Sequence, residues 1–150
     1  MTNEDAQATE QLKQYMGGDE FARLCGIELV SAAPGQARAK MVLGPQHRNG
    51  YGVTQGGAIF TLADFAFAAA SNAHGTVAVA INVNITFMKA AKAGTLWAEA
   101  KENSRNPRLG SYTIEVKDEP GELIAVFQGL VYRKKDPLPL DSASPGVTLS

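Results

Sequence analysis

The segment TQGGAIFTLADFAFAAASN, residues 54–72, places one carboxylate, Asp64, in the middle of an apolar run that predicts a helix. An ionised carboxylate among apolar groups is unfavourable unless it is paired, hydrated or used in chemistry. The residues three and four positions away, which would share its helix face, are largely apolar. Asp64 is therefore a candidate general base or nucleophile, and the alternative is a solvated acid on an outer helix face.

Two glycines begin the same helix and could supply hydrogen-bond donors. The first backbone N–H groups of a helix have no acceptor within it, and the helix dipole favours negative charge at that end. Gly56 and Gly57 carry no side chain that would keep a carbonyl group away from these donors. They could therefore hold the oxyanion that develops when an ester or thioester is attacked.

The spacing between the glycines and the acid predicts a site shared by two chains. Asp64 follows Gly56 by eight residues, which is roughly 12 Å along a helix axis. That separation is too large for the acid to serve the donors of its own helix. Two antiparallel helices across a dimer would bring the acid of one subunit to the glycines of the other.

The rest of the chain supplies the elements that must hold this helix. Residues 26–43 predict a β-hairpin with Pro34-Gly35 at its turn, and a glycine-rich loop at 44–57 precedes the helix, expected from about Gly57 to Ala73. Four strand-like runs follow, at residues 77–90, 94–105, 110–118 and 122–135, and we expect them to form a meander. This order predicts an α+β fold in which a curved antiparallel sheet wraps the helix and leaves an edge for a second copy.

Length and composition predict one globular domain, residues 19–135, in a chain of 150 residues with a net charge of -1. Residues 1–18 are expected to be a polar extension containing a surface helix, and the Pro- and Ser-rich residues 136–150 are expected to be disordered. The charge gives no signature of nucleic-acid binding. The N-terminus lacks a secretory signal and no run is long enough to span a bilayer, so we expect a cytoplasmic protein without membrane partners.

The motif HRNGYGVTQGG, followed by LAD on the helix, resembles a known family. This family is the hotdog-fold acyl-CoA thioesterases of the phenylacetic-acid-degradation (PaaI-like) type, whose pattern is H-x-N-x-x-G-x-x-H-G-G and then an acid about seven residues later. The matching residues here are His47, Asn49, Gly52, Gly56, Gly57 and Asp64. The segment INVNITFMKAAKAG is also similar, and the likeness covers about residues 19–133.

The resemblance implies a hotdog fold, a long central helix wrapped by a bent antiparallel sheet, assembled into homodimers and often into dimers of dimers. It implies hydrolysis of acyl-CoA thioesters, with an aryl-acetyl or medium-chain acyl group, to free acid and coenzyme A. Coenzyme A is then part of the substrate, and no other cofactor or metal is implied. Asp64 would act as base or nucleophile, Gly56 and Gly57 would bind the thioester oxygen, and Asn49 would position the water or the acid.

Two positions depart from the family pattern. Gln55 stands where many members have histidine, and glutamine can donate a hydrogen bond but cannot become cationic. Where some members carry Ser or Thr on the third strand, this chain has Ala80. Asn82 and Asn84 follow at the two-residue period of a strand, so we expect them on the face of Ala80, with one of them facing the catalytic cleft.

The remaining candidates concern the substrate. Phe65 adjoins Asp64 and is the candidate for the acyl pocket. Arg108 with Gly110, in NPRLGSY, is the preferred contact for the coenzyme phosphates among basic residues that include Lys89. His47 is expected to be structural and to tie down the loop.

Two other functions compete with thioester hydrolysis. A non-catalytic acyl-CoA-binding protein would be compatible with Gln55 and Ala80 in place of catalytic side chains. A hotdog dehydratase acting on carrier-bound acyl groups would need a catalytic histidine paired with a carboxylate across the dimer, and Gln55 occupies the obvious place.

Overall fold

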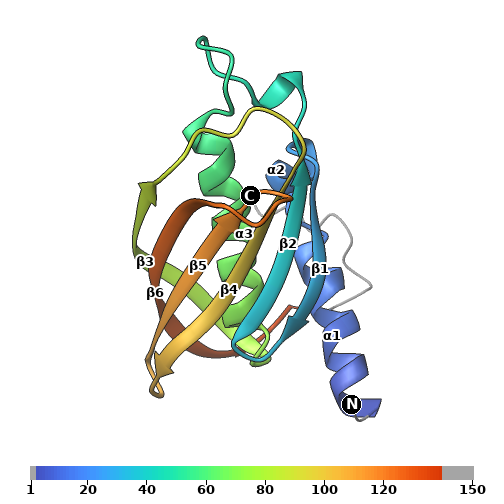
Figure 1. Ribbon diagram of the computed structural model, residues 1–150. Helices are drawn as coiled ribbons and strands as arrows, with labels where there is room; N and C mark the ends of the chain where they lie inside the picture. Colours follow the sequence, from blue (N-terminus) through green and yellow to red (C-terminus); the bar gives the residue numbers. More distant parts are fainter. Residues whose placement is uncertain (1–2, 140–150) are drawn as a thin grey trace.

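A computed structural model of the protein describes residues 3–139, except for the side chains of residues 4–8. Its helices are α1 (Asn3–Met16), α2 (Glu20–Leu24), the short 3-10 helix η1 (Pro45–His47) and α3 (Gly56–Asn72). Its strands are β1 (Ile27–Ala33), β2 (Gln36–Val42), β3 (Thr76–Phe87), β4 (Thr95–Arg105), β5 (Leu109–Lys117) and β6 (Leu123–Pro137). The six strands form one antiparallel sheet that curves around α3 (Figure 1). The predicted hotdog architecture is confirmed.

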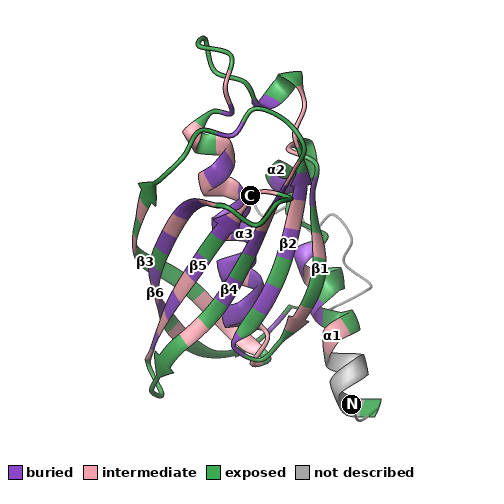
Figure 2. Cartoon of the chain, in the orientation of Figure 1, coloured by how far each residue is buried: buried purple, intermediate pink, exposed green. Residues whose placement is uncertain are grey.

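The apolar character of α3 explains why the sheet wraps it. A helix that is hydrophobic on most sides has to be covered on most sides. α3 lies within the curve of the sheet, and most of its residues are buried (Figure 2). α3 packs against β2 and β4, where Ala39 and Ala98 are fully buried, and it carries the fully buried Ala63 and Ala66. Small side chains on both elements let the helix backbone lie close to these strands.

Aromatic rings fill the space between α3 and the other half of the sheet. The ring of Phe67 lies 5.6 Å from the ring of Tyr112 and 5.5 Å from that of Phe127, centroid to centroid. Gly129 on β6 makes room for it, because a Cβ at that position would lie 2.5 Å from Cζ of Phe67. The glycine is therefore part of the core packing.

The strands lie in the order β1-β2-β4-β5-β6-β3. The predicted hairpin is confirmed, with Ala33 opposite Gln36 across the turn at residues 34–35. The predicted four-strand meander is wrong, because β3 pairs with β6 and crosses over to the far edge of the sheet. The connection at residues 88–94 has no tight hairpin turn, and it is held by other loops instead: Thr54 N donates to Ala91 O (2.8 Å) and Leu43 N donates to Gly94 O (2.9 Å).

The crossover makes β1 and β3 the two edges of the sheet. α1 packs against β1, and its Leu12 and Met16 are buried. β3 has its ladder partner β6 on one side only, and among the described residues nothing pairs with its other side. The edge that remains open is thus β3, the strand that follows α3 directly.

Two polar clusters fix the C-terminal end of α3. The buried side chain of Asn72 donates to Ala68 O (2.8 Å) and accepts from Ala78 N (3.0 Å), which ties the helix end to β3. The carboxylate of Glu102 accepts hydrogen bonds from His74 Nε2 (2.7 Å) and Tyr112 OH (2.8 Å). Burial acts to raise the pKa of Glu102, but these hydrogen bonds and the nearby positive charges hold it below its ordinary value.

The predicted domain limits need one adjustment. β6 runs to Pro137, which pairs with Thr76, and Leu138 is buried. The ordered chain therefore extends beyond the expected limit at residue 135. From residue 140 onward, the predicted disordered tail lies outside the described residues.

Gly129→Ala is expected to destabilise the protein by roughly 1–3 kcal/mol, because its methyl group would overlap the buried Phe67 ring. The measurement is chemical denaturation of the parent and the variant. Gly50→Ala is the matched control, because a Cβ at Gly50 meets nothing within 4 Å. Equal destabilisation by the two substitutions would contradict this packing role.

Candidate active site

The first turn of α3 presents two free backbone donors. Gln55 precedes the helix in an extended conformation (φ -65°, ψ 138°), and its carbonyl accepts from Ala58 N (3.0 Å). The N–H groups of Gly56 and Gly57 have no acceptor among the described residues. Gln55 folds back beside them, since its Oε1 lies 2.5 Å from where a Cβ of Gly57 would be. Free donors at the start of a helix are able to stabilise a developing negative charge.

His47 holds the loop that leads into this helix. It is 3% exposed. Its Nδ1 accepts from Gly44 N (3.0 Å). Its Nε2 lies 2.7 Å from Cys25 O, and because a carbonyl can only accept, the proton is on Nε2. Gln55 N donates to the His47 carbonyl at 2.7 Å. The predicted structural role of His47 is confirmed.

Asn49 shapes the tip of the same loop. Its Oδ1 accepts from Tyr51 N (2.9 Å) and Val53 N (3.3 Å), while its own N–H donates to Val53 O (2.8 Å). The residue is exposed, and within the described part of the chain no hydrogen bond joins it to Asp64. In a single chain Asn49 is therefore a turn former, and its action on substrate stays a prediction.

Asp64 lies half-buried in the middle of α3. Burial raises the pKa of its carboxyl group, and the negative charge of Asp19 raises it further. The side chain of Asp19 is fixed as the N-cap of α2, because its Oδ1 accepts a hydrogen bond from Ala22 N (3.0 Å). No ion pair with Asp64 is present among the described residues. A carboxylate with a raised pKa is a stronger base than an ordinary aspartate, which suits proton abstraction.

The third-strand residues do not share one face. Cross-strand neighbours point to the same side of a sheet, and Ala80 lies opposite Val131, which is buried on the concave side. A β-bulge between Ala80 and Asn82 then shifts the alternation of side chains between the two faces of the sheet. Asn82 and Asn84 point to the convex side, away from α3, while the intervening Val83 packs on the core. The prediction that the asparagines share the face of Ala80 is wrong because of this bulge.

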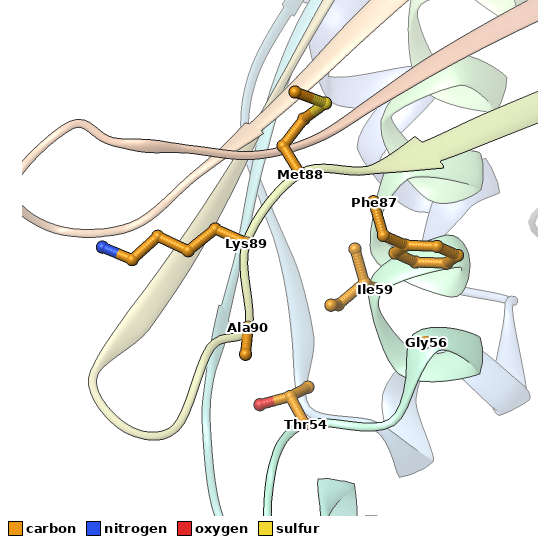
Figure 3. A pocket seen from close by; sticks show the side chains of 7 residues that line it. All are labelled: Thr54, Gly56, Ile59, Phe87, Met88, Lys89 and Ala90. Carbon is orange, nitrogen blue, oxygen red and sulfur yellow. The ribbon is translucent and has the colours of Figure 1, made fainter.

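A pocket of about 420 Å³ opens beside the first turn of α3 (Figure 3). It is lined by Thr54, Gly56, Ile59, Phe87, Met88, Lys89 and Ala90. Phe65, the predicted acyl-pocket residue, is buried in the core and does not line it. Phe87 and Met88 were not among the residues predicted from the sequence. The signal was the run TFMK at the end of a strand, where large apolar residues meet a lysine.

Arg108 and Gly110 lie at the other end of the sheet. They belong to the β4–β5 turn and the start of β5, at the opposite end of the sheet from the end of β3 (Figure 1). The pocket lies at the end of β3. Gly110 is buried within the ladder, and a Cβ there would lie 3.0 Å from the Tyr112 ring. The structure therefore does not bring either residue to Gly56 of the same chain, and Gly110 is a packing glycine. Lys89, which pairs with Glu122, is the basic residue at the pocket.

A helix wrapped by one bent antiparallel sheet is the hotdog fold. The thioesterase superfamily model matches residues 51–125, half of the chain. PaaI, an acyl-coenzyme A thioesterase of Escherichia coli, is 36% identical over 116 residues, which are 77% of this chain and 83% of PaaI. Human acyl-coenzyme A thioesterase 13 is 35% identical over 97 residues, 63% of this chain and 69% of the human protein.

The solved structure of Escherichia coli PaaI superimposes with a TM-score of 0.80 at 32% identity, covering 86% of this chain and 97% of PaaI. The chain therefore belongs to the thioesterase superfamily, and within it to the PaaI-like thioesterases of the hotdog fold, which are thioester hydrolases. None of the helices between residues 3 and 139 is both long and apolar enough to cross a membrane.

Asp64→Asn is expected to leave the protein equally or more stable at neutral pH. The pKa of Asp64 is raised in the folded chain. Between the ordinary carboxyl pKa and this raised pKa, the folded chain binds more protons than the unfolded chain, so the folded chain loses stability as pH rises through this range. The asparagine variant carries no such charge. Its Tm should equal that of the parent at about pH 3 and exceed it by a growing margin above the ordinary carboxyl pKa of about 4. Differential scanning from acid to neutral pH measures this, and a parent that is clearly more stable at neutral pH would contradict it.

Proposed function

We propose that this protein hydrolyses acyl-CoA thioesters to a free acid and coenzyme A at a site shared by two subunits. The observation that carries the proposal is the pairing of two free amides, at Gly56 and Gly57, with a lone half-buried acid two turns further along the same helix. The names of the relatives, acyl-coenzyme A thioesterases, support coenzyme A thioesters as the substrate class.

In the proposed reaction the thioester oxygen accepts from the amides of Gly56 and Gly57. Asp64 of the partner subunit takes a proton from water, which attacks the carbonyl carbon. The tetrahedral oxyanion collapses, the C–S bond breaks, and the coenzyme A thiolate leaves and takes up the proton that Asp64 removed from water. A direct attack by the carboxylate, giving an anhydride that water then hydrolyses, uses the same groups.

The open edge of β3 supports a homodimer. The strand exposes Val79 and Ile81, at 37% and 54%, and an unpaired apolar edge favours pairing with a second copy. Antiparallel pairing of two β3 strands would set the two α3 helices antiparallel beside one another, as the spacing of Gly56 and Asp64 requires. We extend the proposal to a dimer of dimers on the family resemblance.

Within this scheme Lys89 replaces Arg108 as the proposed contact for the coenzyme phosphates, because it lies at the pocket beside the free amides. The acyl group is proposed to be aryl-acetyl or medium-chain. Gln55, beside Gly57, can donate to the thioester or to the water, and Asn49 is proposed to act from the loop.

Binding without turnover is the second candidate, and the glutamine at position 55 favours it. A dehydratase has less support, since both ring nitrogens of His47 are engaged in hydrogen bonds. That histidine is therefore not free to transfer protons with a substrate.

Asp64→Asn is expected to lower the rate of acyl-CoA hydrolysis by about 10² or more, the range of a general base. Release of free thiol from phenylacetyl-CoA and hexanoyl-CoA measures it. Glu20→Gln, which removes an exposed carboxylate on α2, is the control. Equal rates in parent and Asp64→Asn would exclude Asp64 from the chemistry, and saturable binding without thiol release by the parent would favour the binding protein.

Gly56→Pro is expected to lower kcat by about 10²–10³, because proline removes one of the two proposed oxyanion donors. The backbone tolerates it: position 56 is the first helical residue, where proline is favoured, and Gln55 already has the extended conformation that precedes proline.

Gly56→Ala is the matched variant, since it adds a Cβ at the same place but keeps the N–H group. That Cβ would lie 3.0 Å from the tip of the half-exposed Phe87 ring, which can shift. If the alanine variant loses as much activity as the proline variant, bulk and not the lost donor is responsible.

A further inference from the structure

Phe87 lies between the free amides of α3 and the open edge of the sheet. It is the last residue of β3 and pairs with Ala125 of β6. Its ring rests on Gly56, where a Cβ would lie 3.0 Å from Cζ and 3.4 Å from Cε1 of the ring. The residue is nevertheless 51% exposed. The ring is therefore supported by the helix on one side and open on the other.

The pocket has an apolar end and a charged end. The ring of Phe87 lies beside Ile59 and Gly56, while the side chain of Lys89 extends away from them (Figure 3). Ile59 is buried and cannot easily move, whereas Phe87 is an exposed part of this wall, as is Met88. If the thioester carbonyl oxygen accepts from the free amides of α3, the apolar acyl group would lie along Ile59 and Phe87. The anionic coenzyme would then lie toward Lys89.

We propose that Phe87 determines which acyl groups this enzyme accepts, an inference that rests on the proposed function. A planar aromatic acyl group packs against the ring, and such aromatic pairs change binding by about 2–10-fold beyond the area they bury. A long straight chain meets the same ring and must displace it. The enzyme then prefers aryl-acetyl and short acyl groups over long ones, and residue 87 sets that limit.

The test compares kcat/KM for phenylacetyl-CoA, hexanoyl-CoA and dodecanoyl-CoA in the parent, Phe87→Leu and Phe87→Ala. Phe87→Leu keeps an apolar wall without a ring, so the phenylacetyl-to-hexanoyl ratio is expected to fall about 2–10-fold. Phe87→Ala opens the wall, and the dodecanoyl-to-hexanoyl ratio is expected to rise about 10-fold. Tyr132→Leu is the matched control, because it removes another exposed aromatic residue, near the far end of β6.

Because Phe87 is half-exposed, both Phe87→Leu and Phe87→Ala should fold, and thermal unfolding checks this. Unchanged ratios in Phe87→Leu, or in Phe87→Ala, with an active parent would overturn the role of Phe87 and leave the proposed function intact. A uniform fall for all three substrates would also overturn it. A parent that hydrolyses none of the three would instead remove the proposed function on which the inference rests.

Discussion

The whole structure depends on the burial of one apolar helix. α3 must be covered on most sides, and the curved sheet, the small residues of β2 and β4 and the ring of Phe67 over Gly129 all meet that requirement. The same burial makes the helix useful. Its first amides cannot be satisfied from within, and the acid in its middle is held half-buried.

Burial of Asp64 lowers the stability of the folded protein but suits the proposed function of the acid. Desolvation and the charge of Asp19 raise the pKa of this carboxyl group, which makes its ionised form less stable and more basic. A structural acid in this position would be expected to have a cation or a donor beside it, and the described residues provide no ion pair. Retaining an unpaired carboxylate on an apolar helix is physically reasonable if the group accepts a proton from a bound water, and it has no packing advantage otherwise.

Local patterns in the sequence predict the elements well and their long-range arrangement less well. The hairpin at Pro34-Gly35, the helix around Asp64 and four later strands follow from turn residues and hydrophobic period. The position of β3 beside β6 does not, because a crossover is decided by contacts far apart in the chain. The bulge before Asn82 has no local signal and reverses the side-chain direction that a strict period predicts. The positions of Arg108 and Phe87 relative to Gly56 likewise depend on the complete sheet.

In the proposed dimer each site combines Gly56 of one subunit with Asp64 of the other, and subunit mixing tests this arrangement directly. Asp64→Asn and Gly56→Pro chains with different tags are co-refolded, and the heterodimer is isolated by two affinity steps. In a shared arrangement one of its two sites has both intact groups, so the heterodimer should recover about half of the parent's thioesterase activity per dimer. A heterodimer no more active than the two single variants would mean that both groups act within one chain, or not together at all.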